Sequence, residues 1–345
     1  MAAVQLDMTP LRPCRLPCCL VTLLLLAACR GEPSTAPTVE IAASPALAQL
    51  VTEDVDRFWR AYENGGRSGS ASAFQQRYLD SASAGLRDFI GLRQLSAASL
   101  AQVATAYPAY LDALHAWWRT TPDRATVLNT IRANYGKIQA LYPEAVFPPV
   151  TILVGRFSTG GTANDRGLLI GLEFFGRDAQ APLGALPAPV RENQKSWVHD
   201  LPPFVAHEYV HFLQIRARNF SGRDGATLLA RSLNEGIAEF IGALAAGEPT
   251  YRDFFRVWQA NEATYFAEFL REKDGTDISR WLYNQGRTAP GRPGDLGYFI
   301  GYRIAQAYYL KATDKAQAIR DLITLRDPAA LLAQSGYAGS GPPIP

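Results

Sequence analysis

The fold of this chain is decided by residues 204–214, which read Phe204-Val205-Ala206-His207-Glu208-Tyr209-Val210-His211-Phe212-Leu213-Gln214. His207 and His211 are four residues apart, so a helix places both imidazoles on one face, one turn apart. The flanking residues favour a helix, because prolines such as Pro202 are tolerated in a first turn and Gly222 can end the segment. We therefore predict a helix that presents two histidines side by side.

Two neutral imidazole nitrogens at this spacing can bind one tetrahedral Zn²⁺ ion at about 2.0–2.1 Å each. Glu208 follows the first histidine, where its carboxylate can lie beside the ion without binding it and act as general base for a metal-bound water. The chain has only four histidines among 345 residues, so a chance match to this spacing is improbable. The sequence therefore predicts zinc as cofactor, with His207 and His211 as ligands and Glu208 as the catalytic base.

A second predicted helix, residues 228–241, carries two glutamates at the same four-residue spacing. Glu235 and Glu239 share one face, and adjacent carboxylates on an apolar helix repel each other and lose hydration unless a positive group lies near them. The separation between His211 and Glu235 allows one helix, a turn and a second helix that returns beside the first. We predict Glu235 as the third zinc ligand and Glu239 as the carboxylate that orients a ligand imidazole. A solvated acidic face is the alternative.

With these motifs the chain resembles the gluzincin metallopeptidases, which carry His-Glu-x-x-His on one helix and Asn-Glu or Glu-Gly on the next; here Asn234, Glu235 and Gly236 follow. More narrowly, it resembles a bacterial family of predicted Zn-dependent proteases that overlaps the gliding-motility lipoprotein B family. The resemblance covers most of the chain, through residues 78–81, 85–89, 141–143, 160–162, 167–173, 297–302 and 335–337.

The resemblance implies a zincin-like fold and a further catalytic residue. In gluzincins a Tyr, His or Arg from a later helix stabilises the oxyanion of the tetrahedral intermediate. Tyr298, Tyr302 and Arg303 lie in a predicted helix over residues 295–309 and are the candidates for this role. Tyr298 and Tyr302 share a face by their spacing, and packing of both tyrosines in the core is equally compatible with the sequence.

Residues 1–28 have the pattern of a lipoprotein signal peptide, with Arg12 and Arg15 before a short apolar run. The run is too short for a stable membrane span, and it ends in residues 26–29, Leu-Ala-Ala-Cys, which resemble a bacterial lipobox. This pattern predicts lipid attachment at Cys29. We therefore expect a protein anchored by lipid at the bacterial cell envelope, on the outer membrane facing the periplasm if the host has two membranes.

The rest of the chain divides by composition. Residues 29–48 are rich in Pro, Ala, Ser and Thr and predict a flexible tether. Residues 49–338 form one predicted domain, for which the resemblance implies a zincin-like peptidase, with a helical N-terminal part at 49–140 and a catalytic part at 141–338. Residues 339–345 predict a disordered tail. Within the first part, apolar periodicity predicts helices over 51–62, 71–95, 97–118 and 123–140.

Two stretches, residues 150–154 and 168–175, have strand composition and are joined by a glycine-rich connection. They predict a small sheet or hairpin beside the metal-binding helix. In gluzincins an edge strand above that helix pairs with the substrate, since an unpaired edge offers N–H and C=O groups to a peptide. Either strand fits that role, and a purely structural hairpin fits the sequence as well.

The sequence as a whole predicts an α+β, mainly helical protein that is a lipid-anchored zinc metallopeptidase. Its expected partners are a peptide or protein substrate and the membrane that holds its lipid. The net charge of +2 gives no case for binding nucleic acid, and the oligomeric state stays open. The alternative function is a non-hydrolytic, zinc-stabilised envelope scaffold or binding lipoprotein. Glu208 favours the enzyme, because a structural zinc site needs no base and is usually closed by four protein ligands.

Overall fold

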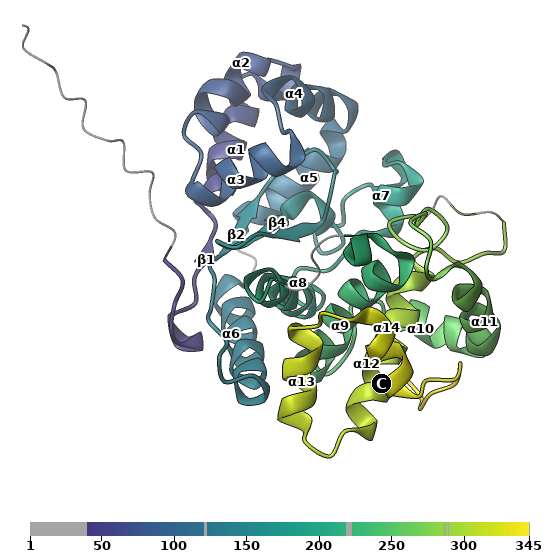
Figure 1. Ribbon diagram of the computed structural model, residues 1–345. Coiled ribbons are helices and arrows are strands. Elements are labelled where there is room, and N and C mark those ends of the chain that lie inside the picture. The colour runs from purple at the N-terminus through teal and green to yellow at the C-terminus, as the bar shows by residue number, and fades with distance from the viewer. Residues whose placement is uncertain (1–39, 121–122, 219–222, 286–287, 289, 345) are drawn as a thin grey trace, which may run out of the picture. The chain divides into compact units, whose positions relative to one another are not determined.

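The computed structural model describes residues 40–120, 123–218, 223–285, 288 and 290–344, most of them in helices (Figure 1). These residues form one compact unit of the α+β class. The predicted signal peptide, Cys29 and residues 29–39 of the predicted tether lie outside the described residues. Within the described part, no helix is both long enough and apolar enough to cross a membrane.

The N-terminal part is helical, as predicted, but its helices are shorter. α1 (Glu53–Glu63) buries its apolar side. Ser83 begins α3 (Ala84–Arg93) and Ser96 begins α4 (Ala97–Ala106), because each hydroxyl accepts a hydrogen bond from the N–H three residues on. Pro108 divides the predicted helix 97–118, since the residue before a proline avoids helical backbone and Tyr107 is non-helical. The remaining helices here are α2 (Ala71–Phe74), α5 (Pro108–Arg119) and α6 (Arg124–Leu141).

The predicted small sheet is present, but its two predicted strands run parallel and do not form a hairpin. It has four strands in the order β1-β2-β4-β3, with bounds β1 (Leu50–Val51), β2 (Val150–Leu153), β3 (Gly161–Ala163) and β4 (Leu168–Gly171). β2 and β4 run parallel, so the chain has to cross back between them, and it does so through β3, which pairs antiparallel with β4. The glycine-rich connection thus contains a strand that the sequence reading missed. β2 and β4 are interior strands and are buried throughout.

The sheet lies between two groups of helices. α1 and α3 contact β2 on one side, and α8 (Leu201–Arg216) contacts β3 and β4 on the other. β3 is the edge strand nearest the cavity described below, and Gly161 in it lies so close to α8 that an added Cβ would come within 2.6 Å of the Phe204 ring. Close packing of this edge on the histidine helix therefore requires glycine at 161.

α8 packs on α9 (Leu228–Ala246), and α9 packs on α12 (Leu296–Lys311) (Figure 1). α9 and α12 cross at two glycines: a Cβ added to Gly236 would lie 2.0 Å from the carbonyl carbon of Gly301, and one added to Gly301 would lie 1.8 Å from the Ser232 carbonyl oxygen. The backbones meet directly at this crossing, which fixes α9 between the other two helices. The predicted helix 228–241 is confirmed and extends to Ala246.

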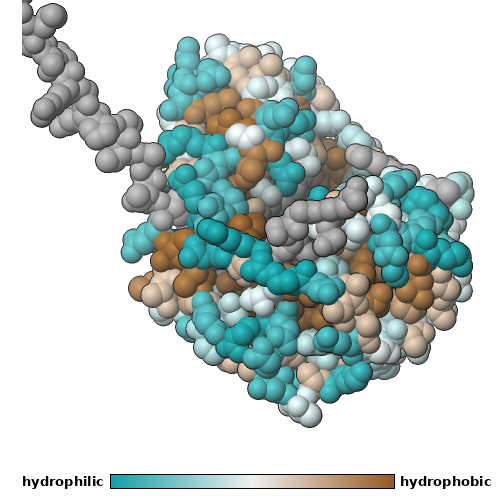
Figure 2. Space-filling view, in the orientation of Figure 1, coloured by the Kyte–Doolittle hydropathy of each residue, from teal (hydrophilic) through white to brown (hydrophobic). Residues whose placement is uncertain are grey.

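The C-terminal part is completed by short helices. Between α9 and α12 along the described chain lie two helices, α10 (Arg252–Trp258) and α11 (Glu262–Glu272), joined by the 3-10 turn Gln259–Asn261. α7 (Ala188–Glu192), α13 (Lys315–Ile323) and α14 (Pro328–Ser335) complete the set. In the orientation of Figure 1, hydrophilic and hydrophobic residues are interleaved over the visible face (Figure 2).

Both ends of the described chain pack on the domain, in contrast to the predicted tether and disordered tail. Ala42 pairs with Phe147 in an isolated bridge, and the Ala48 carbonyl accepts hydrogen bonds from Arg132. At the other end, the Pro342 carbonyl accepts a hydrogen bond from Arg303, and Ile344 is buried. Composition suggested loose segments, whereas a few apolar and backbone contacts hold residues 40–48 and 339–344 in place.

Candidate metal centre

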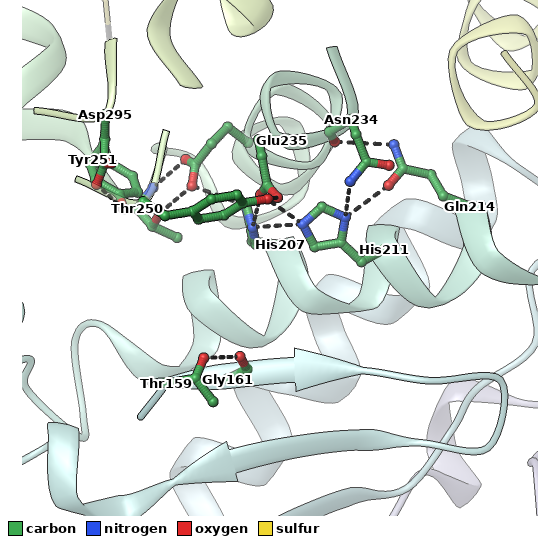
Figure 3. A network of polar contacts seen from close by, with 12 residues as sticks. Thr159, Gly161, His207, His211, Gln214, Asn234, Glu235, Thr250, Tyr251 and Asp295 are labelled. Carbon is green, nitrogen blue, oxygen red and sulfur yellow. Dashed lines mark hydrogen bonds and ion pairs between the residues drawn. The ribbon is translucent and has the colours of Figure 1, made fainter. Parts of the chain in front are cut away.

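The two predicted histidines meet where the helix spacing placed them. His207 and His211 project from one face of α8, and their Nε2 atoms are 3.1 Å apart (Figure 3). α8 is buried along most of its length because it lies between the sheet and α9. Two imidazole nitrogens this close need either a shared proton or a cation between them.

Glu235 completes the group from the neighbouring helix α9. Its Oε2 atom lies 3.0 Å from Nε2 of His211 and 3.5 Å from Nε2 of His207. Three ligands about 2.0–2.1 Å from one tetrahedral ion are separated from one another by roughly 3.4 Å. The observed separations of 3.0 to 3.5 Å fit this requirement. Among the described residues, His207, His211 and Glu235 form the only cluster of its kind suited to a metal ion.

The outer nitrogen of each imidazole also has a neighbour. Oε1 of Glu239 lies 2.9 Å from Nδ1 of His207, close but not aligned as a hydrogen bond. Oε1 of Gln214 lies 2.9 Å from Nδ1 of His211. An acceptor at Nδ1 favours the tautomer whose Nε2 is free to bind a metal. Both imidazoles are therefore oriented with Nε2 toward Glu235.

Glu239 is held by residues outside its own helix. The backbone N–H of Thr250 donates to Oε2 of Glu239 at 2.9 Å, and the Thr250 hydroxyl donates to Oε1. Gln214 is likewise fixed, since its amide donates to the Asn234 carbonyl at 3.2 Å. The structure thus distinguishes the two glutamates of α9: Glu235 faces both Nε2 atoms, and Glu239 faces the far side of His207.

The charges in this cluster shift each other's pKa. Burial lowers the pKa of His207, but Glu239 and Glu235 outweigh this and raise it to about 10. Burial likewise opposes the charge on His211, and Glu235 raises its pKa. Burial raises the pKa of Glu235, yet His211 and His207 hold it well below its usual value. The carboxylates of Glu235 and Glu239 thus favour positive charge at the two imidazoles, and a bound metal ion would supply such charge.

Glu208 lies beside this group and lines the same cavity, with little of its side chain exposed. Its carboxylate faces the edge strand: a Cβ added to Gly161 would lie 2.8 Å from Oε1 of Glu208. Burial raises the pKa of Glu208, although His207 and His211 lower it. A carboxylate with a raised pKa is a stronger base than an exposed one.

The metal cluster opens into a cavity of about 600 Å³. Its walls come from the β3 edge, α8, α9, the segment before α8 and the loop before α12, and Figure 3 shows Gly161 of β3 across from the histidines. The site is therefore accessible from one side, with protein ligands on the other. This is the arrangement of a catalytic site that keeps an open coordination position.

Residues 188–326 match the model of a protein family described as predicted Zn-dependent protease (DUF2268). The match spans α7 to α13 and so includes every residue of the proposed metal cluster. It covers less than half of the chain and supports a zinc-dependent protease family. Comparison with curated proteins and with solved structures gives no match.

Of the three candidates for stabilising the oxyanion, the structure brings only Tyr298 to the cavity. Its ring faces that of His207 at a centroid distance of 6.2 Å. Burial and the nearby Glu235 raise the pKa of Tyr298 well above its usual value, so its hydroxyl stays protonated and able to donate.

Tyr302 and Arg303 do not line the cavity, which corrects their prediction as catalytic residues. Tyr302 packs against Phe240 and Phe255 in the core. Arg303 is buried and donates to Oε2 of Glu262 at 2.8 Å and to the Pro342 carbonyl at 2.7 Å. One turn beyond Tyr298, the side chains of α12 no longer line the cavity. Arg303 instead connects the C-terminal segment to α11 through its hydrogen bonds.

Tyr283 is a cavity residue that the sequence reading missed. Its hydroxyl donates to Oε1 of Glu235 at 2.5 Å, the oxygen that does not face the histidines. The residue sits in the segment before α12 with a backbone φ of 57°, in the left-handed region. No periodicity marks an irregular segment, so its sequence contained no signal for this contact.

Proposed function

We propose that the protein is a zinc metallopeptidase of zincin-like, gluzincin type that hydrolyses peptide bonds. The observation that carries the proposal is the meeting of two different groups in one cavity. His207, His211 and Glu235 form a three-ligand cluster of zinc dimensions, and Glu208 lies beside it without belonging to it. A purely structural zinc site is usually closed by four protein ligands and needs no such base.

His207, His211 and Glu235 would hold the zinc ion, which, when bound, acts as a Lewis acid on the scissile carbonyl and makes a water more acidic. Glu208 accepts a proton as the oxygen of the attacking water bonds to the carbonyl carbon. Glu208 then gives that proton to the amide nitrogen as the C–N bond breaks, so the proton count is balanced. Tyr298, which lines the cavity, donates a hydrogen bond toward the carbonyl oxygen.

The edge strand supports a peptide as substrate. β3 is paired with β4 on one side and ends the four-stranded sheet. No strand among the described residues therefore pairs with the backbone N–H and C=O groups on its other side, where the Gly161 carbonyl accepts a hydrogen bond from the Thr159 hydroxyl. An extended peptide can add to such an edge as a further strand. Gly161 puts this edge beside Glu208, so a peptide paired with β3 would pass the catalytic base.

A Glu208→Gln variant tests the proposal. The amide cannot accept the proton, so turnover should fall by roughly 10²–10⁴-fold or more while zinc content and thermal stability stay near wild type. The assay is mass-spectrometric detection of cleavage in a proteome-derived peptide library. Glu192→Gln, which alters an exposed carboxylate in α7 outside the metal cluster, is the matched control.

Equal cleavage by wild type and Glu208→Gln would show that Glu208 is not the base. A zinc-loaded wild-type protein that cleaves nothing in the library, yet loses its fold when zinc is removed, would support the non-hydrolytic scaffold instead.

The proposed location rests on the N-terminal sequence. The lipobox-like residues 26–29 support acylation of Cys29 and anchoring at the cell envelope, on the outer membrane if there are two. A lipid-anchored peptidase would act on peptides or proteins in the same compartment.

A further inference from the structure

One cation of the cavity has a position that the proposed mechanism does not explain. Lys195 lies in the segment before α8, and its backbone is fixed because its N–H donates to the Phe174 carbonyl at 2.7 Å. Its side chain lines the cavity and is half-buried. Nζ lies 5.3 Å from the centroid of the Phe204 ring and 5.9 Å from that of Tyr251. The ammonium group thus lies against two aromatic side chains at the cavity wall.

Lys195 has no carboxylate partner of its own among the described residues, since no acidic oxygen lies within ion-pair distance of Nζ. The three acidic side chains that act on it from farther away are engaged elsewhere. Asp295 accepts hydrogen bonds from the Asn284 N–H at 2.8 Å and from the Tyr251 hydroxyl at 3.3 Å. Asp200 accepts a hydrogen bond from the Ser196 N–H at 2.6 Å, and Glu239 binds Thr250 and faces His207. Burial lowers the pKa of Lys195, and a bound anion would offset this loss of hydration.

The position of Nζ relative to the metal cluster follows from the rings between them. The Phe204 ring lies parallel to that of His207, with the centroids 6.4 Å apart. The distance from Nζ to the centroid of the His207 ring is therefore at most the sum of two distances, 5.3 Å from Nζ to the Phe204 centroid and 6.4 Å from there to the His207 centroid. An extended peptide advances about 3.3 Å per residue. If the cleaved peptide bond lies at the metal cluster, substrate residues up to roughly three positions from that bond are therefore within reach of Lys195.

We propose that Lys195, Phe204 and Tyr251 form a subsite for a carboxylate of the substrate, within about three residues of the cleaved bond. The inference rests on the proposed peptidase function and names its substrate class. A peptide offers this group as an Asp or Glu side chain or as its C-terminal carboxylate. Charge-assisted contact with a half-buried ammonium should favour such peptides by roughly ten- to hundredfold over neutral analogues.

The test compares wild type, Lys195→Met and Lys195→Glu in the peptide-library assay. Methionine keeps the length and apolar contacts of the side chain but removes its charge. Wild type should require a carboxylate at a fixed position near the cleaved bond, Lys195→Met should lose that requirement, and Lys195→Glu should favour Lys or Arg there. Lys315→Met is the matched control, because Nζ of Lys315 lies over the Tyr309 ring at 4.9 Å but outside this cavity.

A binding experiment separates this inference from hydrolysis. Zinc-loaded Glu208→Gln, with and without Lys195→Met, is titrated calorimetrically with tetra-alanine and its C-terminal amide. A second pair of probes, acetyl-Ala-Glu-Ala-amide and acetyl-Ala-Gln-Ala-amide, distinguishes a side-chain carboxylate from a terminal one. In one of the two pairs, the probe with the carboxylate should bind more tightly than its neutral analogue, by roughly tenfold or more. Lys195→Met should abolish this difference in affinity.

Equal affinity for both members of each pair would overturn the inference. So would a carboxylate preference that persists in Lys195→Met, which would assign the anion to Arg93, the only other Lys or Arg side chain among the described residues of the cavity. If wild type cleaves nothing but the binding difference is present and depends on Lys195, the carboxylate subsite stands and the hydrolytic function fails.

Discussion

Glu235 and Glu239 are one turn apart on α9, yet their neighbours differ. Glu235 lies within 3.5 Å of both Nε2 atoms, whereas Glu239 contacts the opposite nitrogen of His207 and is held by Thr250. Removal of a direct ligand leaves only two imidazoles to hold the ion, whereas removal of an orienting carboxylate leaves all three ligands in place. Substitutions of Glu235 and of Glu239 should therefore have different effects on zinc binding.

We expect Glu235→Ala to abolish stoichiometric zinc binding, and Glu239→Gln to retain zinc with affinity or turnover reduced about 10–100-fold. Zinc content after dialysis, followed by competitive titration with a chromophoric chelator, measures both. Glu268→Gln, a change distant from the cluster in sequence and absent from the cavity wall, controls for loss of charge. A metal-free Glu239→Gln beside a zinc-loaded Glu235→Ala would reverse the assignment.

At the scale of elements, the 3-10 turn Leu172–Phe174 joins β4 to the segment before α8 and carries the fully buried Glu173. The Glu173 carboxylate accepts hydrogen bonds from the backbone N–H groups of Gly155 and Phe157, and so ties the end of β2 to the end of β4. Burial raises the pKa of Glu173 to about 7, although these N–H groups lower it. The connection from β2 to β3 is therefore held by hydrogen bonds to the Glu173 carboxyl group, which titrates near pH 7.

The sign of the pH dependence follows from that shift. Because the folded state holds the proton up to about pH 7 and the unfolded state releases it near pH 4.5, the contribution of Glu173 to stability is full below pH 4.5 and is lost as the pH rises through 7. The loss amounts to at most about 3 kcal/mol. Urea unfolding at pH 5 and pH 8 should show that Glu173→Gln lacks this decline. The effect of zinc binding on stability cancels in the comparison, because wild type and Glu173→Gln have the same zinc ligands. An equal change of unfolding free energy with pH in both proteins would contradict the prediction.

The crossing of α9 and α12 is a second feature at this scale. An alanine at Gly301 would place Cβ 1.8 Å from the Ser232 carbonyl oxygen, so the helices would have to separate. We expect Gly301→Ala to lower the free energy of unfolding by about 3 kcal/mol, the upper part of the range for overpacked cores. Gly136→Ala is the control: nothing lies within 4 Å of a Cβ there, and alanine in α6 should stabilise by about 0.5–1 kcal/mol. Equal effects of the two changes would show that the crossing tolerates a methyl group.

For the whole molecule, the proposed anchor and the proposed site belong to separate parts of the chain. The metal cluster lies entirely within residues 207–235, and the lipid-attachment prediction concerns Cys29. Loss of the anchor should therefore leave the zinc site unchanged.

Cys29→Ser should move the protein from the membrane fraction to the soluble fraction, because several acyl chains anchor stably and their loss removes the main membrane affinity. Immunodetection after fractionation measures the location, and zinc content of the released protein should equal that of wild type. A Cys29→Ser protein that stays fully in the membrane fraction would defeat the proposed anchor. Ser34→Ala, a few residues further along the predicted tether, is the control substitution.

The sequence by itself determined the local part of the site. The spacing of His207 and His211 sets their relation on any helix, and the apolar period of α9 identified the helix that carries Glu235 and Glu239. These are short-range consequences of 3.6 residues per turn, so no tertiary contact is needed to foresee them. The length of chain between His211 and Glu235 also allowed α9 to return beside α8, and the structure shows that the two helices pack together.

Only the tertiary structure decided what depends on contacts between distant segments. β3 lies in a glycine-rich stretch without strand periodicity, and it becomes a strand because β4 offers it a partner. Tyr302 and Arg303 follow Tyr298 closely in sequence, but the crossing of α12 over α9 turns them into the core. Tyr283 and Lys195 reach the cavity from irregular segments, where position is set by packing and backbone hydrogen bonds rather than by any repeat in the sequence.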